Sequence, residues 1–177
     1  MAVKLVSSTI SHKTDVGGVV LGCRTPAEAT AAAESIAAAL RARGLEEGME
    51  GLLVQEMARP GTDLIVGGLH DPVFGPTLLV GIGGAEAEVW RDRRVALAPA
   101  GPIASRELWD GLRGSPLLDG WRGLPAVGRE ALAGLTARVG WLMSDLPAVA
   151  ELDLNPVRAA ADGTPVVLDA RIRRAAQ

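Results

Sequence analysis

The run Glu-Leu-Asp-Leu-Asn-Pro at residues 151–156, followed by Val-Val-Leu-Asp at residues 166–169, decides the fold of this chain. Both runs are short, rich in apolar residues and separated by turn-forming residues, so they predict the two strands of a β-hairpin. Side chains alternate between the two faces of a strand, so Glu151, Asp153 and Asn155 are expected to share one face. The sequence therefore predicts a hairpin with one polar face.

The turn of this hairpin determines which residues face each other across it. If residues 161–163 form a three-residue loop with Gly163 in the left-handed bulge position, Asn155 pairs with Asp169. An amide oxygen and a carboxylate then converge, and Mg²⁺ is usually held by one or two protein oxygens, with phosphates and water completing its octahedron. From the pattern alone, a solvated polar face on an edge hairpin is the more common alternative.

Glycine, proline and capping residues mark the boundaries of helices and strands in the rest of the chain. Thr-Pro-Ala-Glu at residues 25–28 predicts the start of a helix, and Gly44 predicts its end. Two further helices are expected at residues 105–113 and 129–143. Strands are expected at residues 2–6, 17–21, 52–57, 64–69, 77–82, 87–90, 95–98, 149–154 and 165–170, with those from 52 to 98 in one sheet. The mixture of helices and hairpin-spaced strands predicts the α+β class.

Composition excludes several function classes. The net charge is -3 and the basic residues are scattered, so a nucleic-acid partner is not expected. No apolar stretch approaches the roughly 20 residues that cross a bilayer, so no membrane partner is expected either. The single cysteine, Cys23, excludes an intrachain disulfide framework, is expected to be a core thiol, and fits a cytoplasmic location.

Several motifs, in this order, resemble one known family. They are Ser-His-Lys-Thr-Asp-Val-Gly-Gly-Val at residues 11–19, Val-Gln-Glu-Met at 54–57, Asp-Pro-Val-Phe-Gly-Pro at 71–76, Gly-Ile-Gly-Gly at 81–84, and the run at 151–156. Together they resemble the ATP-grasp domain of ADP-forming acyl-CoA (acetyl-CoA) synthetases, which is related to the succinyl-CoA synthetase β subunit. The resemblance implies two lobes, with residues 1–50 as the remainder of an incomplete first lobe and residues 51–177 as the second.

The resemblance also implies the metal ligands and a phosphoryl carrier. Asn155 and Asp169 match the Mg²⁺ ligands of the family, and His12 matches the histidine implicated in carrying a phosphoryl group between the nucleotide site and a partner domain. A neutral imidazole is nucleophilic near pH 7, which suits that task. Without the resemblance, a histidine in such a polar loop is usually solvated surface.

Further residues are expected to bind ATP or ADP. By resemblance, Lys4 holds phosphates as a point charge, and the hinge residues Gln55, Glu56 and Met57 read the adenine edge. Gly83 and Gly84 would let the backbone approach the phosphates, and Glu88 would assist the metal side of the site. The ordinary alternatives are a surface lysine, a strand that ends in a charged residue, and a glycine turn.

The resulting prediction is an enzyme component, the nucleotide-binding part of an ADP-forming acyl-CoA ligase (an acid-thiol ligase). It would transfer phosphoryl groups between ATP/ADP with Mg²⁺ and a phosphohistidine relay. CoA-binding and ligase domains, on the same chain or another subunit, would be its partners in an oligomeric assembly. Two alternatives stay open: a degenerate nucleotide-sensing or structural module of a larger acyltransferase, and an interaction domain that binds no nucleotide.

Overall fold

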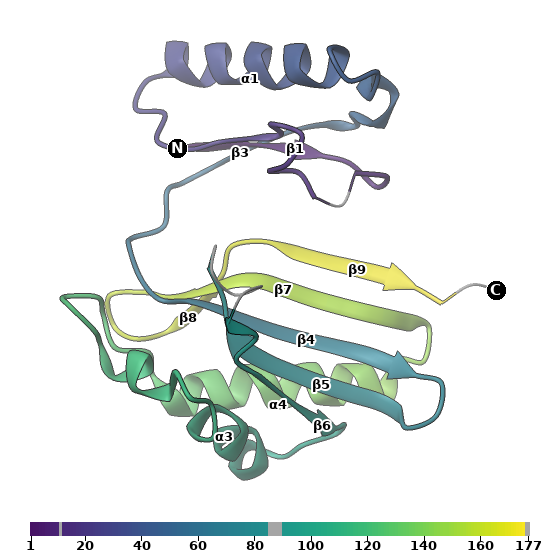
Figure 1. Cartoon of the computed structure of the whole chain (residues 1–177), viewed down its shortest axis with the longest axis vertical. Helices are drawn as coiled ribbons and strands as arrows, with labels where there is room; N and C mark the ends of the chain where they lie inside the picture. Colours follow the sequence, from purple (N-terminus) through teal and green to yellow (C-terminus); the bar gives the residue numbers. More distant parts are fainter. Residues whose placement is uncertain (11, 85–89, 176–177) are drawn as a thin grey trace. The chain divides into compact units, whose positions relative to one another are not determined.

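The computed structural model describes residues 1–10, 12–84 and 90–175. The chain divides into two compact units, Met1–Met57 and Ala58–Gln177 (Figure 1). Within the described ranges, no helix is long and apolar enough to cross a membrane.

The first unit is a three-stranded antiparallel sheet packed against one helix. The strands are β1 (Ala2–Val6), β2 (Val19–Val20) and β3 (Gly51–Gln55), in the order β2-β1-β3, and α1 spans Pro26–Arg41, followed by the 3₁₀ turn η1 (Glu46–Gly48). The predicted start of α1 is confirmed, because the Thr25 hydroxyl accepts the Glu28 N–H at 3.2 Å. Val3 and Leu5 of β1 are fully buried with Ile36 and Leu40 of α1, and Cys23 joins this core as predicted.

The prediction that residues 52–57 share a sheet with the later strands is wrong. β3 pairs along its whole length with β1, from Ala2 opposite Gln55 to Val6 opposite Gly51. The division between the units therefore falls after Met57, later than the expected boundary at residue 50. An apolar run predicts a strand, but its partner depends on long-range packing that the run itself does not encode.

The second unit is a larger antiparallel sheet with two helices on one face (Figure 1). Its strand order is β6-β5-β4-β7-β8, and β9 also pairs with β7, along an earlier part of that strand than β8 does. The strands are β4 (Asp63–Asp71), β5 (Gly75–Ile82), β6 (Arg93–Leu97), β7 (Val149–Ala159), β8 (Pro165–Val167) and β9 (Ala170–Arg174). The helices are α3 (Pro102–Asp110) and α4 (Arg129–Asp145), with the 3₁₀ turn η2 (Ser115–Asp119) between them.

Two predicted boundaries in this unit shift. The helix expected from residue 105 begins at Pro102, and Ser105 is buried inside it with its hydroxyl donating to the Ala100 carbonyl at 3.3 Å. Residues 165–170 contain all of β8 and the first residue of β9, because the chain leaves the strand at Leu168 and Asp169. Most of the strand expected at residues 87–90 lies outside the described residues.

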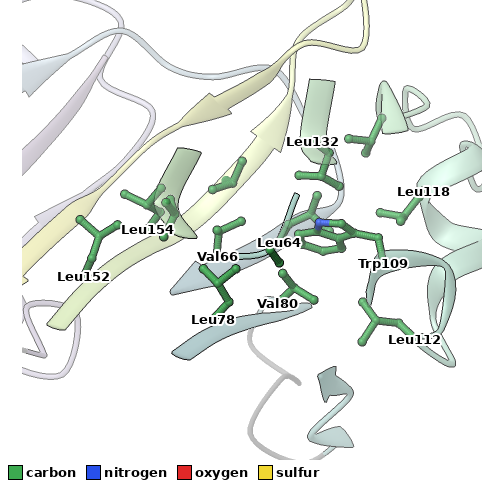
Figure 2. Close-up of a cluster of buried hydrophobic side chains, with 14 of the residues drawn as sticks. Leu64, Val66, Leu78, Val80, Trp109, Leu112, Leu118, Leu132, Leu152 and Leu154 are labelled. Carbon is green, nitrogen blue, oxygen red and sulfur yellow. The ribbon is translucent and has the colours of Figure 1, made fainter. Parts of the chain in front are cut away.

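The core of the second unit lies between the sheet and its helices. Figure 2 shows this cluster, with apolar side chains from the strands meeting Trp109 of α3 and Leu132 of α4. The strand residues are Leu64, Val66, Leu78, Val80, Leu152, Leu154, Val157 and Ala159. The Trp109 indole N–H donates to the Thr136 hydroxyl at 3.0 Å, which satisfies both buried polar groups. Strand alternation places the intervening residues on the other side, here called the helix-free face.

Candidate functional site

The C-terminal hairpin has the predicted register. Val157 pairs with Val167, and Ala159 pairs with Pro165. In the same register, the Asn155 N–H donates to the Asp169 carbonyl at 3.1 Å. At the turn, the Ala160 N–H donates to the Thr164 carbonyl at 2.8 Å, and Gly163 has a φ of 83°. The three-residue loop with a left-handed glycine is thus confirmed, and it brings Asn155 opposite Asp169.

The polar face of this hairpin is also present. Leu152 and Leu154 are buried against the helices, whereas Glu151 and Asp153 are half-buried and Asn155 is exposed. Burial raises the pKa of the Asp153 carboxyl, and the nearby charges of Glu151 and Asp169 raise it further, with Arg171 acting in the opposite direction. Carboxylates and arginines therefore share the helix-free face beside Asn155, where Glu151 accepts from Arg173 Nε at 2.9 Å.

The oxygens of Asn155 and Asp169 suit a hard divalent cation whose remaining ligands come from a nucleotide and water. One amide oxygen and one carboxylate would fill two positions around Mg²⁺, and phosphate oxygens and water would fill the rest. Within the described residues, no group of three or more His, Cys, Asp or Glu side chains is arranged to hold a metal. Asp153 was not among the predicted site residues, although its place in the same alternating run signalled that it shares their face.

His12 lies exposed in a loop of the first unit that is tied down near both ends. The Ser8 N–H donates to the Glu50 carboxylate at 2.7 Å, and the Ser8 hydroxyl donates to the same oxygen. On the other side of His12, the Gly18 N–H donates to the Lys13 carbonyl at 2.7 Å. The two bonds from Ser8 lower the pKa of Glu50, because the Ser8 hydroxyl and N–H both stabilise its charged form.

Two of the remaining predicted residues of the first unit, Lys4 and Gln55, lie in its sheet. Lys4 pairs with Leu53, and Gln55 pairs with Ala2, so alternation places Lys4 and Gln55 on the face opposite α1. Gln55 Oε1 is buried and has no hydrogen-bond partner among the described residues. Glu56 and Met57, which follow β3, are exposed.

In the second unit, Gly83 lies close to the beginning of β4. Its N–H donates to the Asp63 carbonyl at 2.7 Å, and a Cβ at this position would come within 3.1 Å of that same backbone. Gly84 has a φ of 94°, a conformation that favours glycine. Glu88 lies outside the described residues.

A pocket that the sequence did not predict lies on the helix-free face of the second unit. It has a volume of about 460 Å³ and is lined by Ile65, Leu79, Gly81, Ile82 and residues 91–93. Ile65 lies where the pairing of β4 with β7 shifts, between the pairs Leu64 with Val157 and Val66 with Leu154. The pocket therefore lies next to the strand segment that contains Asn155.

Comparison with known proteins identifies the fold. The chain matches the family model of the ATP-grasp domain over residues 1–173. It is 34% identical over 172 residues to the β subunit of ADP-forming acetate–CoA ligase I from Pyrococcus furiosus, a match that covers 97% of this chain and 74% of that subunit. It is also 34% identical over 157 residues to a trans-feruloyl-CoA synthase from an unidentified prokaryote, which covers 89% of this chain and 22% of that protein.

A solved synthetase has the same architecture. Acetyl-coenzyme A synthetase 1 of Ca. Korarchaeum cryptofilum, in complex with coenzyme A, Ca-AMPCP and HgCl⁺, matches with a TM-score of 0.91 at 37% identity, covering 98% of this chain and 76% of that one. In a second structure of that protein, with coenzyme A and Mg-AMPPCP, the phosphohistidine segment points towards the nucleotide binding site. That structure matches with a TM-score of 0.81 at 36% identity, covering 99% of this chain and 76% of that one.

The chain belongs to the ATP-grasp domain family, and it matches the β-subunit part of ADP-forming acetyl-CoA synthetases. The predicted α+β ATP-grasp fold is confirmed. The chain spans 22% of the length of the trans-feruloyl-CoA synthase and 74% of the Pyrococcus β subunit.

Proposed function

We propose that this chain is the nucleotide-binding ATP-grasp part of an ADP-forming acyl-CoA synthetase, an acid-thiol ligase. The observation that carries the proposal is the hairpin register, in which Asn155 lies opposite Asp169 beside the half-buried Asp153. The relatives support it, because they include a β subunit of an acetate–CoA ligase and a synthetase solved with Mg-AMPPCP.

Asn155 and Asp169 would hold Mg²⁺, and the other residues that match the family would supply the remaining nucleotide contacts. A bound Mg²⁺ neutralises the charge that develops on the transferred phosphoryl group. Lys4 would hold phosphate oxygens, and the backbone at Gln55, Glu56 and Met57 would bind the adenine edge. Gly83, Gly84 and Glu88 are proposed at the phosphate and metal side. The first unit would then correspond to the remainder of the first ATP-grasp lobe, and the second unit to the second lobe.

His12 is proposed as the phosphoryl carrier. In the direction of ATP synthesis, a partner domain forms an acyl phosphate and passes its phosphoryl group to a histidine. An oxygen of the ADP β-phosphate then attacks the phosphorus on His12, the N–P bond breaks, and the imidazole leaves in its neutral form. The two ties around the loop would hold this imidazole in place between transfers.

The remaining steps of the reaction require other domains. CoA-binding and ligase domains, on the same polypeptide or another subunit, would bind the acid and coenzyme A, and the assembly would be an oligomer in the cytoplasm. The Pyrococcus relative is itself one subunit of its ligase, which supports this division of labour. The similarity to ligases does not favour the alternative of a degenerate sensor or structural module.

Phosphorylation of the histidine tests the proposal. The chain, together with its partner domains, is incubated with MgATP labelled at the γ-phosphate, and the protein-bound label is tested for the acid lability of phosphohistidine. We expect label on the wild type and a large loss of label in His12→Asn. Equal labelling of both proteins would exclude His12 as the carrier, and nucleotide binding without any labelling would favour a sensor.

A further inference from the structure

The pocket on the helix-free face contains two arginines that no step above uses. Arg93 of β6 and Arg91, just before it, line one side of the pocket, and both are exposed. Arg93 pairs with Gly81, and its neighbour Val95 pairs with Leu79, so alternation places Arg93 on the same face as Leu79 and away from the helices. The orientation of Arg93 is thus determined by the strand register.

The charge at this pocket is positive. Asp92 is the acidic residue among the described lining residues, and its carboxylate already accepts two backbone N–H groups. They belong to Arg113, at 3.1 Å, and Gly114, at 2.6 Å. These bonds use Asp92 to attach the start of β6 to the loop after α3, so its charge is already compensated. Arg91 and Arg93 therefore give the lining a net positive charge, which attracts an anion.

The surface of the sheet between Arg93 and the hairpin contains a glycine, Gly81. Gly81 pairs with Ile65 of β4 on one side and with Arg93 of β6 on the other. The register between β4 and β7 shifts at Ile65, which faces the part of β7 that contains Asn155. Gly81 has no side chain, and a Cβ there would come within 3.0 Å of the Asp92 carbonyl and 3.3 Å of the Arg93 Cβ. An arginine side chain can therefore lean across Gly81 towards the hairpin.

The distance across the sheet from β7 to β6 suits a phosphate chain. Neighbouring strands lie about 4.8 Å apart, so the three steps from β7 to β6 span roughly 14 Å. A nucleotide whose phosphates bind a cation at Asn155 and Asp169 would extend part of this way, and a long guanidinium side chain would cover the rest. The planar fork of arginine binds two phosphate oxygens at once.

We propose that Arg93, assisted by Arg91, forms an anion subsite for the terminal phosphoryl group of the nucleotide. The subsite rests on the proposed function, because it presumes that ATP binds at the hairpin. Arg93 is a contact of the γ-phosphoryl group, and the α- and β-phosphates are held elsewhere. Its loss therefore affects binding of the triphosphate and leaves binding of the diphosphate nearly unchanged.

Calorimetry with two nucleotides tests this subsite. Wild type, Arg93→Gln, Arg93→Lys and Arg138→Gln are titrated with the magnesium complexes of AMPPCP and of ADP. Arg138→Gln is the matched control, because Arg138 is an exposed arginine of α4 and its loss changes the net charge equally. A charge-assisted hydrogen bond predicts that Arg93→Gln raises the Kd of Mg-AMPPCP about 10-fold or more, whereas the Kd of MgADP changes less than about twofold.

The results of these titrations test the Arg93 subsite separately from the proposed nucleotide-binding function. Arg93→Lys should bind Mg-AMPPCP more tightly than Arg93→Gln, because it keeps the charge but loses the fork. An unchanged Kd for Mg-AMPPCP in Arg93→Gln, or equal weakening of both nucleotides, overturns the subsite and leaves the proposed function standing. A wild type that binds neither nucleotide overturns both. The thermal unfolding midpoint of each variant without nucleotide shows that the comparison is between folded proteins.

Discussion

Arg158 of β7 donates from Nε to the Asp63 carboxylate of β4 at 2.6 Å, and each side chain is 23% exposed. The pair joins the strand that contains Asn155 to the beginning of the strand whose Asp63 carbonyl accepts the Gly83 N–H. The Cγ of Arg158 also lies against Gly61, where an added Cβ would come within 2.8 Å of it. The ion pair thus adds to the backbone pairing of β4 with β7 next to the proposed phosphate region.

Removal of this pair should destabilise the second unit. We expect Arg158→Met to lower the free energy of unfolding by about 1–3 kcal/mol, because the Asp63 carboxylate loses its partner where water has limited access. Denaturant unfolding followed by circular dichroism measures the change. Arg173→Gln is the control, since its pair with Glu151 is more exposed and should contribute less than about 1 kcal/mol. Equal losses in the two variants would contradict this reading.

Stabilisation by MgADP should be lost when the Asp169 carboxylate is neutralised. Wild type at about 100 times its Kd for MgADP should gain about 2.7 kcal/mol of stability. Asp169→Asn should lose most of this gain, whereas Glu151→Gln, altered on the same face, should keep it. Thermal shift with ADP in the presence of Mg²⁺ or EDTA makes the comparison. No shift in the wild type would favour the interaction domain that binds no nucleotide.

The raised pKa of Asp153 predicts a pH-dependent stability. A carboxyl whose pKa is higher in the folded state than in the unfolded chain favours folding only while it is protonated, so its ionisation at neutral pH destabilises the protein. Asp153→Asn should therefore raise the thermal midpoint of the metal-free protein at pH 7. The difference should shrink as the pH falls towards the ordinary carboxyl value of 3.8. A constant difference across this range would show that ionisation of Asp153 is not the cause.

The loop that contains His12 should depend on Glu50. Glu50→Ala removes the acceptor of both Ser8 donors, and we expect labelling of His12 from MgATP to become a few-fold slower. The MgADP thermal shift should not change. Glu47→Ala, an exposed acidic residue in the neighbouring 3₁₀ turn, serves as the control. If Glu50→Ala and Glu47→Ala label at the same rate as the wild type, the tie to Ser8 does not position the loop.

Local patterns predicted much of this molecule. The alternation at residues 151–156 and the turn glycine at position 163 were sufficient to derive the pairing of Asn155 with Asp169, because hairpin register follows from loop length. The cap at Thr25 predicted the start of α1 for a similar reason, since the contacts involved lie within one turn of the chain. The family motifs added the expected roles, and these stay predictions.

The tertiary structure decided what depends on distant contacts. The sequence alone predicted most of the strands and helices, which face of the hairpin is polar, and which residues match the family. Only the folded chain assigned β3 to the sheet of β1, placed Arg93 beside Gly81, and raised the pKa of Asp153 through burial and neighbouring charges. Strand pairing and burial are set by the packing of the whole unit, so no local pattern of residues contains them.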